Sequence, residues 1–67
     1  MNILLKIAKK RLEDYGFTNV IIDEEKIEIT PPKASINNIK IAEDILDASG
    51  VDFTKIYKSN GNIKCVF

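Results

Sequence analysis

One short pattern occurs twice in this chain: a helix-forming segment, a glycine, an apolar residue and then a strand-forming segment. The two copies read "LEDYGFTNVII" and "LDASGVDFTKI". Before each glycine the apolar residues recur every three or four positions, which is typical of an amphipathic helix. A glycine at such a point takes the left-handed conformation that ends a helix, and the next apolar residue folds back onto the last turn. We therefore expect helices that end at Gly16 and Gly50, each followed by strands.

The two predicted helices are separated by Pro31-Pro32, which cannot lie inside a paired strand. The first helix runs over residues 2–15, and the second follows the prolines with Ser35 or Thr30 as its N-cap. Each has an apolar side at helical spacing. These sides are Leu5, Ala8, Leu12 and Tyr15, widened by Leu4 and Ile7, and Ile39, Ala42, Leu46 and Ser49, widened by Ile41, Ile45 and Ala48.

The strand-forming segments are arranged as two hairpins. Asn60-Gly61 strongly predicts a two-residue turn, because both residues tolerate positive φ. That turn pairs Ser59 with Asn62, Tyr57 with Lys64, Ile56 with Cys65, and Lys55 with Val66. In the other hairpin, a turn at Glu24-Glu25 pairs Val20 with Ile29, Ile22 with Ile27, and Asp23 with Lys26. Glutamate disfavours the positive φ of tight turns, so a longer loop is an alternative there.

The resulting order is α-β-β-α-β-β, and we expect one α+β domain over residues 1–67. Its fold class is a two-layer sandwich, in which a four-stranded antiparallel sheet carries both helices on one face. A chain of 67 residues buries only about 60% of its unfolded surface. Cys65 is the single cysteine and histidine is absent, so neither a disulfide nor a closed zinc site can add stability. A well-packed core, with or without a second copy of the chain, must supply it.

A sheet covered on one side leaves the other side open. In the second hairpin the more aliphatic face, which includes Ile56, Ile63 and Cys65, is the expected core face. The opposite face and one residue of the first hairpin form the candidate partner-binding surface: Ile21, Phe53, Lys55, Tyr57, Lys64 and Val66. Aromatic residues with a charged rim are typical of protein interfaces, so the expected partner is another protein or a second copy in a homodimer. Alternatively, some of these residues fold under the sheet edges, or the register differs by one.

Nucleic acid binding is the second hypothesis. Lysines beside aromatic rings on an open sheet can hold single strands, and Lys6, Lys9, Lys10 and Arg11 make a basic strip on the first helix. A solvated helix face also explains that strip. Ten basic and ten acidic residues give zero net charge, which weakens the phosphate attraction that such binders use.

The sequence contains few residues of the kinds that catalyse reactions. Without histidine, general base catalysis near neutral pH would need a strongly shifted carboxylate or lysine, and Cys65 lies at a predicted core position. We expect no enzymatic activity, no cofactor, no metal and no membrane association, and a cytoplasmic location. Many isoleucines and lysines are typical of AT-rich coding, which by analogy favours an accessory protein of a phage or mobile element.

Overall fold

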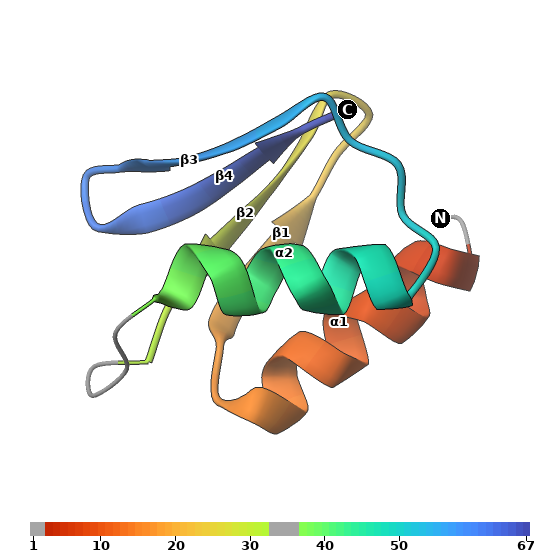
Figure 1. The fold of residues 1–67 in the computed structure, drawn as a ribbon, viewed down its shortest axis with the longest axis horizontal. Helices are drawn as coiled ribbons and strands as arrows, with labels where there is room; N and C mark the ends of the chain where they lie inside the picture. Colours follow the sequence, from red (N-terminus) through yellow and green to blue (C-terminus); the bar gives the residue numbers. More distant parts are fainter. Residues whose placement is uncertain (1–2, 33–36) are drawn as a thin grey trace.

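The computed structural model describes residues 3–32 and 37–67. It contains two helices and four strands in the predicted order α-β-β-α-β-β. These are α1 (Ile3–Tyr15), β1 (Thr18–Ile22), β2 (Lys26–Thr30), α2 (Asn38–Ala48), β3 (Lys55–Ser59) and β4 (Asn62–Val66). Figure 1 shows the antiparallel sheet as one layer, with both helices on the same side of it. The predicted α+β fold with a four-stranded antiparallel sheet is confirmed.

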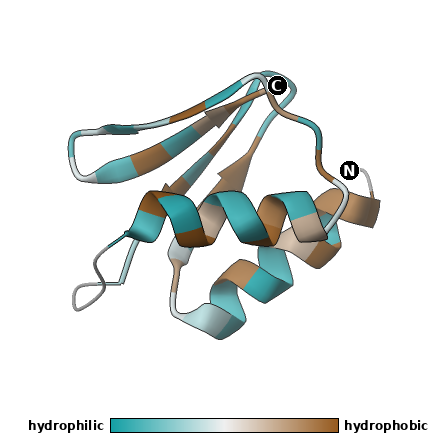
Figure 2. Cartoon of the chain, in the orientation of Figure 1, coloured by the Kyte–Doolittle hydropathy of each residue, from teal (hydrophilic) through white to brown (hydrophobic). Residues whose placement is uncertain are grey.

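The strands lie in the order β1-β2-β4-β3. Each hairpin therefore supplies one central strand and one edge strand, and the two halves of the chain meet along the β2–β4 ladder. This ladder aligns Ile27 with Cys65 and Ile29 with Ile63, so four apolar side chains face the helices at the centre of the sheet. Hydrophobic and hydrophilic residues alternate along β4 (Figure 2). Ile63 and Cys65 are buried, whereas Lys64 between them is only partly buried.

Both helices end in the way that the repeated pattern predicts. The Phe17 N–H donates to the Leu12 carbonyl and the Val51 N–H to the Leu46 carbonyl, each at 3.0 Å. Phe17 and Val51 are buried. Gly16 has a φ of +112°, outside the range that L side chains readily adopt, which explains the glycine at this position. The start of α2 was not predicted correctly: Thr30 lies in β2 and the N-cap is Asn37, while Ser35 lies outside the described residues.

The second hairpin has the predicted register at every pair, with positive φ at Asn60 and Gly61. The first hairpin departs from the predicted register at the end away from its turn. Ile22 lies opposite Ile27 as predicted, but between the pairs Thr18–Thr30 and Ile21–Glu28 β1 contains one residue more than β2. This β-bulge occurs at Asn19, whose φ is +49°. The bulge adds a residue without turning Val20 away from the core.

A side chain stabilises the turn between β1 and β2. The Asp23 carboxylate accepts hydrogen bonds from the N–H groups of Glu25 at 2.7 Å and Lys26 at 2.9 Å. The Asp23 N–H in turn donates to the Lys26 carbonyl at 3.0 Å. Neither glutamate needs a positive φ, because this Asp-stabilised turn closes the hairpin without one. The two N–H donors also lower the pKa of Asp23 below its usual value.

The core is one cluster between the helices and the inner face of the sheet. Its buried apolar members come from every layer: Ala8, Leu12, Phe17, Val20, Ile27, Ile29, Ala42, Leu46, Val51, Ile63 and Cys65. Cys65 is fully buried there, and burial raises the pKa of its thiol to about 11. Tyr15 was predicted on the core side of α1 but is 57% exposed, and its ring lies 6.2 Å from the ring of the buried Phe17.

Candidate functional site

The open face of the sheet is formed by cross-strand rows of side chains. One row runs from Ile21 on β1 through Glu28 on β2 and Lys64 on β4 to Tyr57 on β3. In the next row Val66 on β4 lies between Lys26 on β2 and Lys55 on β3. The structure therefore brings together five of the six residues predicted for partner binding, beside Glu28, which the alternation also places on this face. It adds Lys26, which the sequence interpretation left out.

Apolar surface on this face is divided into separate parts. Ile21 is 60% exposed on one edge strand and Tyr57 is 37% exposed on the other, with Glu28 and Lys64 between them. Val66 is only partly exposed. The Lys55 ammonium lies 5.0 Å from the centre of the Tyr57 ring, within the range of a cation–π contact. Charged side chains thus interrupt the apolar patch that the alternation predicts.

Three lysines and one glutamate make the open face net positive. Glu28 accepts a hydrogen bond from the Asn62 amide at 3.3 Å, and the Asn62 amide oxygen accepts one from the Thr30 hydroxyl at 3.2 Å. Glu28 therefore belongs to a local polar network, whereas Lys26, Lys55 and Lys64 form no ion pair among the described residues. The face presents cations around Tyr57 and Val66.

Phe53 does not belong to this face. It was predicted beside Tyr57 from simple alternation, but it is half-buried and packs against the core cluster. The reason is that β3 begins at Lys55, so Phe53 lies in the loop that leads into the strand, where alternation does not apply. The Thr54 N–H donates to the Val66 carbonyl at 2.7 Å and marks the point where the paired chain begins.

The basic strip of α1 is partly occupied by contacts within the protein. The Arg11 guanidinium donates to the Ser49 hydroxyl at 3.2 Å and to the Ala48 carbonyl at 3.4 Å, and so links α1 to the end of α2. Lys10 pairs with Asp14 at 3.7 Å, with both side chains largely exposed. The pattern of charges in the sequence could not reveal the first contact, because it joins residues far apart in the chain.

Exposed apolar side chains are concentrated on α1. Ile3, Leu4, Ile7 and Tyr15 are exposed there, whereas the open sheet face contributes Ile21 and Tyr57. Ile7 lies in a shallow hollow whose other walls are charged residues of the same helix: Lys6, Lys10, Arg11 and Asp14. The apolar pattern of α1 was predicted to be a wide core stripe, but the inner side of the helix is filled by Ala8 and Leu12.

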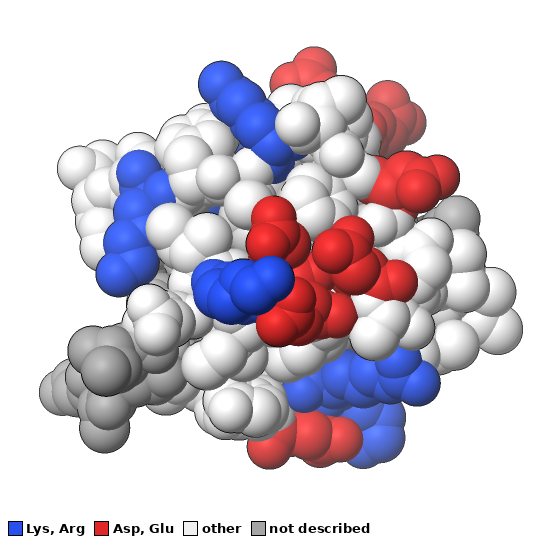
Figure 3. Space-filling view, in the orientation of Figure 1, with Lys and Arg blue, Asp and Glu red and all other residues white. Residues whose placement is uncertain are grey.

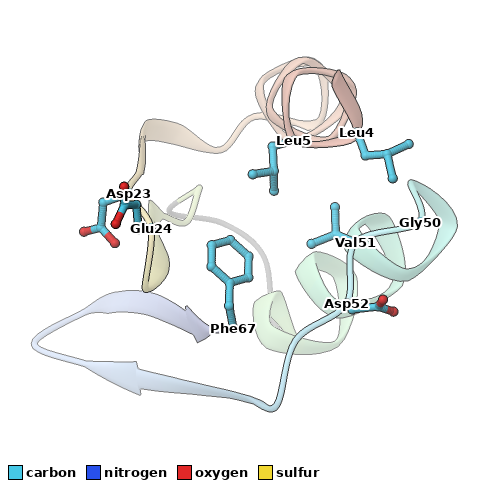
Figure 4. Close-up of a pocket in the computed structure, with 8 residues that line it drawn as sticks. All are labelled: Leu4, Leu5, Asp23, Glu24, Gly50, Val51, Asp52 and Phe67. Atoms are coloured by element: carbon cyan, nitrogen blue, oxygen red, sulfur yellow. The ribbon is translucent and has the colours of Figure 1, made fainter. Parts of the chain in front are cut away.

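A cavity of about 390 Å³ lies at one end of the sandwich. Its walls come from the start of α1, the β1–β2 turn, the segment after α2 and the end of the chain: Leu4, Leu5, Asp23, Glu24, Gly50, Val51, Asp52 and Phe67. Figure 4 shows Leu5, Val51 and Phe67 directed toward the space between these segments, with Asp23 and Glu24 on one side and Asp52 on the other. Four separate segments form this cavity, so no local sequence pattern could predict it.

Charge is segregated over the surface. Figure 3 shows carboxylates gathered over α2 beside a lysine. Lys40 there pairs with Asp44 at 3.1 Å and with Glu43 at 3.7 Å, and these carboxylates raise the pKa of Lys40. The acidic surface of α2 and the basic open face of the sheet therefore lie on different sides of the protein.

The described part of the chain was examined for metal clusters and for membrane-crossing helices. Residues 3–32 and 37–67 contain no group of three or more His, Cys, Asp or Glu side chains placed to hold a metal ion. Neither helix has the length and apolar character that crossing a bilayer requires, within those residues. Comparisons with protein-family models, curated proteins and solved structures gave no match for this chain. A functional proposal must therefore rest on the surfaces described above.

Proposed function

We propose that this protein is a small, non-enzymatic binding module of the cytosol, and that its open sheet face contacts an acidic surface of a partner protein. By analogy with other short chains of AT-rich coding, the partner belongs to a larger machine that a phage or mobile-element accessory protein modulates. The observation that supports this proposal is the arrangement of Lys26, Lys55 and Lys64 around Tyr57 and Val66 on one rigid sheet.

Tyr57 and Val66 provide the apolar contact, because both lie on strands held by the antiparallel ladder. Tyrosine contributes a large contact area with few rotatable bonds, and such residues often dominate binding energy. The three lysines surround these side chains and complement carboxylates on the partner. Ile21 extends the contact to the opposite edge of the sheet, where it is 60% exposed.

A different protein suits this face better than a second copy of the chain. In a two-fold symmetric pairing, each residue meets the equivalent surface of its partner. The net-positive patch of one copy would then meet the same net-positive patch of the other, and juxtaposed like charges weaken such an interface. A homodimer through this face is an alternative, and light scattering coupled to size exclusion distinguishes a dimer from a monomer by its mass.

Nucleic acid binding is a second candidate, supported by the Lys55 ammonium above the Tyr57 ring. Binders that hold single strands on a sheet stack several bases on aromatic side chains. Because Phe53 packs into the core, Tyr57 is left as the aromatic residue of the open face. On α1, Arg11 donates to Ser49, so one of the four predicted cations is partly engaged within the protein. Both findings favour a protein partner.

The test compares two tyrosines. Tyr57→Glu reverses the character of the open face, and Tyr15→Glu makes the same change at an exposed tyrosine on α1. A partner captured from the source cells is purified, and its affinity for each variant is measured by calorimetry after circular dichroism has shown that both fold. We expect Tyr57→Glu to weaken binding about thirtyfold or more, as for a central interface aromatic, and Tyr15→Glu to leave it unchanged. The opposite order of effects would overturn the proposal.

A direct test addresses nucleic acid. Fluorescence anisotropy with labelled oligo-dT and oligo-U at low salt should show no binding that depends on Lys55 and Lys64. If both oligonucleotides bind and charge reversal at these lysines abolishes binding with a reduced salt slope, the nucleic-acid hypothesis replaces the protein-partner proposal.

A further inference from the structure

The cavity at the end of the sandwich lies apart from the open sheet face and combines apolar walls with an acidic rim. We propose that it is a binding site for a small aliphatic amine in its protonated form, with the hydrocarbon chain against Leu5, Val51 and Phe67 and the ammonium group on the side of Glu24. This site is independent of the proposed partner surface, because none of its lining residues lies on that face.

The apolar walls are fixed by the fold. Val51 is held by its N–H bond to the Leu46 carbonyl, and Phe67 by its N–H bond to the Glu25 carbonyl, each at 3.0 Å. Leu5 lies on the first turns of α1 and packs against the core. Figure 4 shows these three side chains directed toward a common space. A cavity with walls held in this way is present before a ligand arrives, which reduces the ordering cost of binding.

The charges that line the cavity all have the same sign. Asp23, Glu24 and Asp52 contribute carboxylates, and no lysine or arginine is among the lining residues. The ion pairs among residues 3–32 and 37–67 join Lys10 to Asp14 and Lys40 to two acids of α2. Lys26 lies near Asp23 and partly offsets its charge, whereas Glu24 has no ion pair among those residues. Asp23 stays ionised to lower pH than usual because of its two N–H donors. The rim therefore attracts a cation.

The partial charges at the helix termini do not change the net negative charge around the cavity. The start of α1 contributes about half a positive elementary charge and the end of α2 about half a negative one. Both termini border the cavity, through Leu4 and Leu5 on one side and Gly50 on the other. Their effects oppose each other, so the side-chain carboxylates determine the preference of the site.

The size of the cavity favours a small molecule over a segment of another protein. Small-ligand pockets measure about 300–1,000 Å³, and this cavity, which is open to solvent on one side, has about 390 Å³. Its apolar walls favour a hydrocarbon chain over a polar body. A monoamine with a short alkyl chain satisfies the volume, the walls and the charge together.

The experiment is a titration of the isotope-labelled protein with n-hexylamine hydrochloride, followed by amide chemical shifts. Hexanoate and hexanol are the matched probes, because they keep the chain and change only the head group. We expect saturable shifts at the amides of Leu5, Val51 and Phe67 with the amine, and none at the same concentration of hexanoate. Affinity should rise up to about fourfold for each methylene from propylamine to hexylamine, as expected for burial of the chain.

Variants test the role of the rim. Glu24→Gln should weaken hexylamine binding about twofold to fivefold, as for an exposed ion pair, whereas Glu13→Gln, which removes one exposed carboxylate of α1 outside the cavity, should have no effect. Equal binding of hexanol and hexylamine, or no shifts at these amides with any amine, would overturn the proposal. Tyr57→Glu should leave amine binding unchanged, so failure of the partner proposal and failure of this one give different results.

Discussion

The contact between Arg11 and Ser49 gives a sharp test of whether the basic strip of α1 is structural. Arg11 donates to the Ser49 hydroxyl at 3.2 Å, and that hydroxyl donates to the Ile45 carbonyl at 2.7 Å. Ser49 itself is buried at the end of α2. A double-mutant cycle with Arg11→Gln and Ser49→Ala isolates the interaction between the two side chains, because the bond from Ser49 to Ile45 is lost equally in both branches.

The expected coupling free energy is about 1 kcal/mol. A hydrogen bond from a charged donor contributes roughly 1.5–3 kcal/mol when it is buried. The Arg11 side chain is largely exposed and its bond to Ser49 is long, so solvent reduces this value toward that of a surface pair, about 0.2–1 kcal/mol. A chain of this size has a free energy of unfolding of about 3–10 kcal/mol. Losing about 1 kcal/mol of it is therefore measurable, and the variants still fold.

The assay is urea unfolding of the four proteins, followed by far-UV circular dichroism. With a slope near 1 kcal/mol per molar urea, a coupling of this size moves the midpoint by about 1 M. The exposed pair Lys10 and Asp14 is the matched control, and its cycle of Lys10→Gln with Asp14→Asn should give less than about 0.5 kcal/mol. A coupling near zero between Arg11 and Ser49 would refute the reasoning and return Arg11 to the free basic surface.

Three further predictions concern Cys65, Asp23 and Gly61. The buried thiol of Cys65 should react with a chromogenic disulfide at least about a hundredfold more slowly than in the urea-unfolded chain, and reaction at the unfolded rate would contradict its core position. The folded pKa of Asp23 lies below 3.8, so its stabilising effect is present above that pH and is lost as the pH falls through the folded pKa. Acid titration of stability should therefore be steeper for the natural protein than for Asp23→Asn, and equal slopes would contradict the Asp-stabilised turn. Gly61 has a φ of +81° and open space around a new Cβ, so Gly61→Ala should cost only the backbone strain of about 1 kcal/mol and lower the Tm by about 4–8 °C. An unchanged Tm would show that this strain is absent.

Local patterns predicted the elements of this fold well. Asn60-Gly61 determines the register of the second hairpin because a two-residue turn leaves no freedom in the pairing. Gly16 and Gly50 mark the helix ends because a left-handed residue breaks the helical hydrogen bonding. In each case a few adjacent residues determine the backbone conformation, so the prediction did not depend on tertiary contacts.

The wrong predictions concern positions where a single residue or a contact between distant parts of the chain determines the structure. Asn19 adopts positive φ and inserts a bulge, although asparagine tolerates many conformations and predicts none of them uniquely. Phe53 lies just before its strand, so the core rather than the alternation determines its direction. The β2–β4 pairing, which defines the open face and places Lys26 on it, joins the two halves of the chain and has no local sequence signal.

That central pairing also has a consequence for how the chain folds. Its aligned residues, such as Ile29 and Ile63, are separated by more than half of the sequence. The entropy of closing so long a loop must be overcome before the ladder contributes any stability. Either hairpin alone is a two-stranded sheet, which is at best marginally stable in water. Folding should therefore be slowest at the step that joins the halves, and isolated fragments of one helix and one hairpin should gain structure only when they are mixed.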